Sequence, residues 1–156
     1  MVIPVRTVIY TVTEKDSVRA IELSPEFCRH KPAVMASARL VAVCEWPCME
    51  QLREGLGPHQ CSLGVFQHLR HTGPIPIGAR IALAARCVSR SGPYSEWEVE
   101  VHDGFELVGS AHLGFVVVDQ AEFERRRLHG KHPAEARSPV AGQDHEDVRS
   151  IVGLGI

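Results

Sequence analysis

The feature that most constrains the fold is the longest helical pattern in the chain, PAVMASARLVAVCEWPCMEQLREGL at positions 32–56. Proline suits the first turn of a helix, and glycines follow the last turn. Spacings of three and four predict one helix face that carries Val34, Ser37, Val41, Glu45, Cys48 and Leu52. A carboxylate in the middle of such a stripe is costly to bury without a partner or a function. Glu45, and Ser37 two turns before it, are therefore candidate functional residues.

The rest of the chain is predicted mainly as strands. β-Branched residues indicate a strand at 2–13, and Pro4 favours a place at a sheet edge. After the helix the apolar period changes to two, which predicts strands at 60–72, 79–90, 95–102 and 105–119. The segment 14–31 is expected to be a loop with a short helical turn, and 120–128 a short helix with Asp119 as its N-cap. Within the long helix, Pro47 removes one backbone hydrogen bond and predicts a kink near Val43.

This order of elements predicts an α+β fold, with one long helix packed on a curved antiparallel sheet of about five strands. It is also the element order of the hot-dog fold. At 156 residues the chain is expected to hold one domain, at 1–128. The remaining residues, 129–156, are rich in proline, glycine, histidine and mixed charge, and we expect a poorly ordered C-terminal tail.

Composition excludes several classes of partner. The formal net charge of −2 gives no basic footprint for nucleic acid or an anionic membrane. No run approaches the roughly 18 apolar residues of a membrane span, and the first residues lack the pattern of a signal peptide. The five cysteines are odd in number and form no CxxC, which favours free thiols in a reducing compartment. We therefore expect a cytoplasmic protein with neither a nucleic-acid nor a membrane partner.

Three groups of short motifs follow one another along the chain. The helix contains Met35-Ala36-Ser37 and Cys44-Glu45-Trp46, the next strand contains Ser62-Leu63-Gly64 and His71-Thr72, and a late hairpin contains His102-Asp103-Gly104. Each motif alone is weak, but their joint order and spacing are specific. Over roughly positions 25–127 the chain resembles the fluoroacetyl-CoA thioesterase branch of the hot-dog thioesterases.

The resemblance implies a set of roles. Ser37, Glu45 and His71 fall on the positions of a catalytic triad that acts on an acyl-CoA thioester. Gly64 falls on the strand that lines the acyl site, and Phe27 on the lid segment before the helix, so both are implied to bind substrate. The resemblance also implies a homodimer, or a higher oligomer, with active sites at the subunit interface. No separate cofactor is expected, because coenzyme A enters as part of the substrate; a carrier protein is the alternative acyl carrier.

Two departures from the family pattern concern the substrate. Gly114 stands where the family often has an arginine, and Arg29-His30-Lys31 stands where a second lid aromatic is found beside Phe27. We therefore expect the reaction class to be shared and leave the acyl group open.

The resemblance implies acyl transfer, and the residues do not fix the nucleophile. A serine is a poor nucleophile at its free pKa and needs an adjacent base, for which His71 is the candidate. Glu45 either orients that imidazole, attacks the thioester itself or activates water. Gly64 either lets a substrate approach the backbone closely or marks a bulge in the strand. The main prediction is a thioester hydrolase that cleaves a small acyl-CoA.

Other functions remain open. The missing arginine at Gly114 motivates a non-catalytic hot-dog module that binds an acyl-CoA or another small acyl ligand. A hydratase is disfavoured because positions 32–56 contain no Asp-His pair. A metal site is not expected: His68 and His71 are an odd number apart and should face opposite sides of a strand. The phosphates of coenzyme A would have to meet scattered arginines such as Arg70, Arg86 or Arg90.

Overall fold

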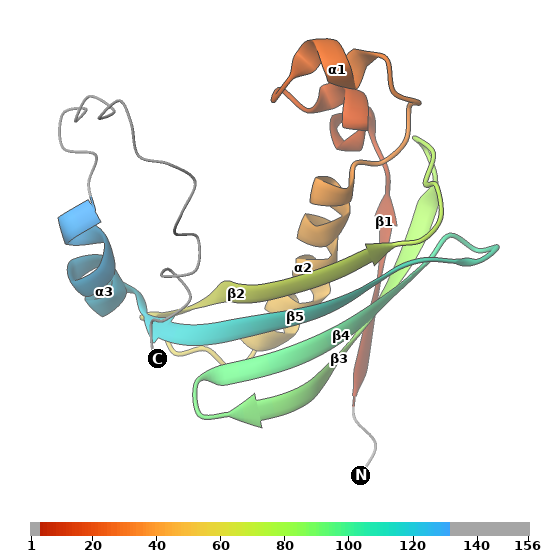
Figure 1. Ribbon diagram of the computed structural model, residues 1–156. Coiled ribbons are helices and arrows are strands. Elements are labelled where there is room, and N and C mark those ends of the chain that lie inside the picture. Colours follow the sequence, from red (N-terminus) through yellow and green to blue (C-terminus); the bar gives the residue numbers. More distant parts are fainter. Residues whose placement is uncertain (1–3, 132–156) are drawn as a thin grey trace, which may run out of the picture. The chain divides into compact units, whose positions relative to one another are not determined.

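The computed structural model describes residues 4–131 (Figure 1). Within them, a five-stranded antiparallel sheet has the strand order β1-β3-β4-β5-β2. The strands are β1 (Val5–Thr11), β2 (Gln60–His71), β3 (Arg80–Ser91), β4 (Tyr94–His102) and β5 (Leu107–Asp119). The main helix, α2 (Ser37–Arg53), lies against one face of the curved sheet (Figure 1). The α+β prediction is confirmed, and so is the edge position of the first strand.

Short elements complete the chain. Between β1 and α2 lie η1 (Glu14–Asp16), η2 (Val18–Ala20) and α1 (Pro25–Arg29), where a loop with a helical turn was expected. After β5 the chain forms α3 (Gln120–Phe123) and a π-helical turn η3 (Glu124–Leu128), followed by η4 (His129–Lys131). The predicted N-cap is present, because the Asp119 carboxylate accepts from the Glu122 N–H at 2.9 Å.

The chain divides into two units, Met1–Glu122 and Phe123–Ile156. The first holds the sheet and α2. Most of the predicted tail, residues 132–156, lies outside the described part of the structure. No helix among the described residues is long and apolar enough to cross a membrane.

The core fills the space between α2 and the sheet. In β4, Trp97, Val99 and Val101 are buried while Glu98 and Glu100 face the other side, as the alternation predicts. Aromatic and aliphatic side chains of β5, Phe115 and Leu113 among them, pack in the same layer. We refer to the sheet face that carries α2 as the inner face and to the opposite one as the outer face.

The predicted helix was too long at its start. The segment 32–36 is extended, and α2 begins at Ser37 with Ala36 as its N-cap. The cause is tertiary: the Val34 C=O accepts from the Val18 N–H at 2.8 Å, and the Met35 N–H donates to the Ile75 C=O at 2.8 Å. These bonds compete with helix formation and hold the segment between two loops. Pro47 is buried inside α2, which continues through it to Arg53.

The predicted apolar stripe was also displaced. The buried side chains of α2 are Leu40, Val43, Cys44, Pro47, Cys48 and Leu52. Glu45 therefore lies at the margin of the buried face, half-buried and beside β2, instead of in its middle. The cost of burying its carboxylate is correspondingly smaller, and the position gives it access to solvent and ligand.

Candidate active site

Ser37 and His71 meet at the junction of α2 and β2. The Ser37 Oγ lies 2.9 Å from the His71 Nδ1, although the residues are 34 positions apart in the sequence. Ser37 occupies the first helical position of α2 and His71 the last position of β2. A hydroxyl at this distance donates to an unprotonated imidazole nitrogen. The pair thus has the contact that activation of a serine by a histidine requires.

The loop after β2 holds these two ends together. The Thr72 N–H and the Gly73 N–H both donate to the Val108 C=O, at 2.9 and 3.2 Å, which fixes the end of β2 on β5. Further on, the C=O of the buried Ile75 accepts from the Met35 N–H. The helix α2 begins at Ser37, two residues after Met35. The contact between Ser37 and His71 is therefore built into the backbone pairing of the segments that carry them.

A buried carboxylate fixes the same helix end from the other side. Asp16 is inaccessible to solvent and accepts from the Tyr10 hydroxyl at 2.8 Å and from the Arg39 Nε at 3.0 Å. Burial alone would raise the pKa of Asp16, but the hydrogen bonds from Thr13, Tyr10 and Arg39 together lower it below its ordinary value. The Asp16 C=O also accepts from the Ala36 N–H at 2.8 Å. The start of α2 is thereby tied to β1 and η1.

His71 is poised as a base. Burial lowers the pKa of His71 below 6.5, by more than the nearby Gly73 backbone raises it. Its Nε2 is buried and has no hydrogen-bond partner among residues 4–131. When Nδ1 accepts from Ser37, Nε2 carries the ring proton, so the structure leaves a buried donor without an acceptor. Such a donor is costly, and it indicates a missing partner at this point of the site.

Glu45 does not contact this pair. Its Oε1 accepts from the Gln67 Nε2 of β2, and within the described residues no hydrogen bond joins it to Ser37 or His71. Eight residues of helix separate Ser37 from Glu45, or about 12 Å along the axis. The three predicted catalytic residues thus lie along the junction of α2 and β2, with the Ser37–His71 pair at one end and Glu45 further along.

Gly64 lies beside Glu45. A Cβ added at Gly64 would come within 3.0 Å of the Glu45 Oε1, so the absence of a side chain makes room for the carboxylate. The register of β2 shifts between Gly64 and Phe66, so the strand has the bulge that the sequence analysis gives as one interpretation of Gly64.

Phe27 lies apart from these groups, on α1. Its side chain is 69% exposed, and the Lys31 ammonium stands 4.7 Å from the centre of its ring. Lys31 belongs to the Arg29-His30-Lys31 segment, which stands where a second lid aromatic would be expected, and it makes a cation–π contact with Phe27. The structure therefore shows a single, largely exposed aromatic side chain on the short helix α1.

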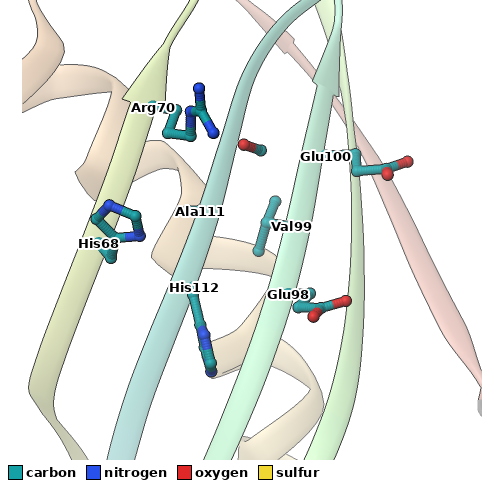
Figure 2. A pocket seen from close by; sticks show the side chains of 8 residues that line it. His68, Arg70, Glu98, Val99, Glu100, Ala111 and His112 are labelled. Carbon is teal, nitrogen blue, oxygen red and sulfur yellow. The ribbon is translucent and has the colours of Figure 1, made fainter.

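The outer face has its own hollow, of about 210 Å³, lined by His68, Arg70, Glu98, Val99, Glu100, Ser110, Ala111 and His112 (Figure 2). His68 faces this side and His71 the inner side, as their spacing predicts. Gly114 also belongs to the outer face: an added Cβ would meet the Tyr94 hydroxyl at 2.8 Å and the Phe66 Cβ at 2.9 Å. A side chain at position 114 would therefore point away from Ser37, and its absence does not weaken the inner site.

Other sequence candidates have structural neighbours of their own. Cys44 and Cys48 pack in the core, and burial raises the pKa of each thiol to about 12, which keeps them protonated. Arg86 is paired with Glu98, and the Arg90 guanidinium lies 5.8 Å from the Trp97 ring. Arg70 lines the outer hollow.

Sequence reasoning missed Gln67, Asp16 and Arg39. Gln67 shares the inner face with His71, four residues away on β2, but no motif in the sequence marks it as a partner of Glu45. The Asp16–Arg39 pair joins a loop to a helix over 23 positions, and no local pattern signals it.

Known proteins resemble this chain in sequence and in fold. The family model described as fluoroacetyl-CoA-specific thioesterase matches residues 12–121. A fluoroacetyl-CoA thioesterase from Streptantibioticus cattleyicolor is 32% identical over 103 residues, which are 66% of this chain and 73% of that protein. A solved structure of a fluoroacetyl-CoA thioesterase superposes with a TM-score of 0.78 at 30% identity, over 85% of this chain and 98% of the other. A hot-dog-like protein from Thermanaerovibrio acidaminovorans, 19% identical, superposes with a TM-score of 0.72 over 84% and 93% of the two chains and supports the fold.

Proposed function

The chain belongs to the fluoroacetyl-CoA-specific thioesterase family, whose members are thioester hydrolases with the hot-dog fold, and we propose that it hydrolyses a small acyl-CoA at Ser37 and His71. The observation that carries this proposal is the 2.9 Å contact between the Ser37 Oγ and the His71 Nδ1. Fluoroacetyl-CoA is one substrate to test. The single lid aromatic, Phe27, and its contact with Lys31 support keeping the acyl group open.

In the first half of the reaction, the Ser37 Oγ attacks the thioester carbon while His71 Nδ1 takes the hydroxyl proton. The Ser37 and Ala38 N–H groups precede the first helical bonds of α2, which Arg39 and Leu40 donate to the Ala36 C=O, so they are the backbone donors that we assign to the oxyanion. Collapse of the tetrahedral intermediate breaks the C–S bond, and the departing thiolate receives the proton from His71. In the second half, water repeats the sequence on the acyl-serine and releases the acid.

We infer that the working unit is a homodimer built on the free edge of β2. This edge strand exposes the apolar Val65 and Phe66, and unpaired edges of this kind associate readily. Within one chain, Gln67 and His71 are about 13 Å apart along β2. Antiparallel pairing of two β2 strands about a two-fold axis at Leu69 would set residue 71 of one copy opposite residue 67 of the other, since 71 and 67 lie equally far from 69.

This pairing supports a shared site. Glu45 is bonded to Gln67, so the Glu45 of a second copy would approach the imidazole of the first. It would supply the acceptor that the buried His71 Nε2 lacks. Glu45 would then orient the imidazole and stabilise its protonated form. The five free cysteines support a reducing compartment, and we propose the cytoplasm.

Release of the coenzyme A thiol from a panel of short and aromatic acyl-CoAs, fluoroacetyl-CoA included, tests the function. We expect Ser37→Ala and His71→Ala each to lower kcat by about 10²–10⁴-fold, the usual range for loss of a positioned acid–base group. His68→Ala, which changes the neighbouring histidine on the outer face, is the matched control and should leave kcat unchanged. Tight acyl-CoA binding in calorimetry with no thiol release would instead identify a binding module.

A further inference from the structure

Gln67 of β2 contacts the Glu45 carboxylate of α2, and it takes no part in the proton transfers proposed for Ser37 and His71. Its Nε2 donates to the Glu45 Oε1, across 22 positions of sequence. A hydrogen bond from an amide to a carboxylate is charge-assisted and stronger than one between neutral groups. It is the only hydrogen bond that Glu45 makes through its side chain within residues 4–131.

The β2 bulge makes this contact possible. Gly64 is paired with Phe115, Phe66 with Gly114 and Gln67 with Leu113. The extra residue, Val65, lets positions 64 and 67 share the inner face although they are an odd number apart. A regular strand would have turned either Gly64 or Gln67 to the outer face.

Gly64 completes the arrangement. The Oε1 of Glu45 lies 3.0 Å from the point where a Cβ on Gly64 would stand, and the Gln67 Nε2 lies 3.8 Å from the same point. The Glu45 carboxylate therefore lies against the backbone of Gly64 and within hydrogen-bond distance of the Gln67 amide. One oxygen is held by Gln67, while the other accepts no hydrogen bond from the described residues.

We propose that Gln67 is a positioning residue that fixes the Glu45 carboxylate for catalysis. The bond to Oε1 restricts the glutamate to one rotamer and leaves Oε2 as the free acceptor. In the proposed dimer, Oε2 is then presented to the His71 Nε2–H of the other copy. The inference rests on the proposed function, because it gives Gln67 its effect through Glu45 alone.

A double-mutant cycle tests this role. Gln67→Met keeps the length and approximate volume of the side chain but removes the donor, and Glu45→Gln removes the charge. Because Gln67 acts on geometry, we expect Gln67→Met to lower kcat by about 10–100-fold, the loss that follows a small misplacement of a catalytic group. KM should change little. In the Glu45→Gln background the same substitution should cost nothing further, since the carboxylate that Gln67 positions is no longer present.

Two further variants sharpen the result. Gln67→Lys keeps a donor of similar reach and should retain more kcat than Gln67→Met, which a purely structural role would not predict. His68→Gln, on the outer face of the same strand, controls for changes to β2 and should behave as wild type. Melting temperatures show whether each variant folds.

The outcomes separate this inference from the proposed function. If Glu45→Gln lowers kcat but Gln67→Met does not, Gln67 has no positioning role and the thioesterase assignment stands. Equal losses from Gln67→Met in both backgrounds would also overturn the inference, because Gln67 would then act independently of Glu45. If Glu45→Gln itself leaves kcat unchanged, both the role of Glu45 and that of Gln67 are wrong.

Discussion

At the scale of single residues, the contact between Ser37 and His71 is the basis of the proposed chemistry. A general base works best when it is unprotonated at the working pH and close to the proton that it removes. Burial supplies the first condition, since it lowers the pKa of His71. The pairing of the loop after β2 with the segment before α2 supplies the second.

The pH dependence of kcat/KM follows from the sign of that shift. A lowered pKa means that more than half of the His71 side chains are neutral at pH 6.5, the ordinary midpoint of histidine. We expect kcat/KM to fall toward acid pH with a midpoint below 6.5, because protonation removes the base. A pH profile of thiol release measures this. A midpoint above 6.5 would contradict the assignment of His71 as the base.

At this scale the sequence predicted the pair but not its neighbours. Ser37 and His71 were found because the family spacing is kept without gaps, and the structure brings them into contact. The partner of Glu45 was not found: the sequence suggested only the His71 imidazole, whereas in the structure the Gln67 Nε2 donates to its carboxylate from another element, 22 positions away.

At the scale of elements, the start of α2 is decided by tertiary contacts. Helical spacing continues back to Val34, yet the chain from 32 to 36 is extended because its backbone groups bond to Val18 and Ile75. Sequence periodicity describes which face an element buries, but it does not include competing partners from distant loops. The strands were predicted within a few residues because each is bounded by proline, glycine or a hairpin signal in the chain itself.

Asp16 should be the main stabilising group at this helix end. Asp16→Ala removes the acceptor of Tyr10, Thr13 and Arg39 at a site closed to solvent. We expect it to lower the free energy of unfolding by about 2–4 kcal/mol, as loss of one partner of a buried charged network does. Urea unfolding of the two proteins measures the difference. The exposed Glu14 of the same turn gives the control. The free energy of unfolding of Glu14→Ala should stay within about 0.5 kcal/mol of wild type. Equal losses from Asp16→Ala and Glu14→Ala would contradict this account.

At the scale of the whole molecule, a single chain holds all three proposed catalytic residues but does not bring them together. Ser37 and His71 lie at one end of the junction of α2 and β2, and Glu45 lies about two helical turns away. A second copy joined through β2 would run in the opposite direction, so its Glu45 would come near the first copy's Ser37 and His71. The proposed dimer would then supply an acceptor to the His71 Nε2, which has none among residues 4–131.

Mixing inactive chains tests this division of the site. In a heterodimer of Ser37→Ala and Glu45→Gln chains, a shared site places both changes in one active site and leaves the other with wild-type Ser37, His71 and Glu45. With random pairing, half of the dimers carry one intact site of two, so coexpression should restore about one quarter of wild-type activity. The matched control combines Ser37→Ala with His71→Ala: these residues act from the same chain, so every site keeps one lesion and activity should stay at the level of the single variants. If the first mixture forms heterodimers but recovers no activity, Glu45 acts within its own chain, and the shared site is wrong.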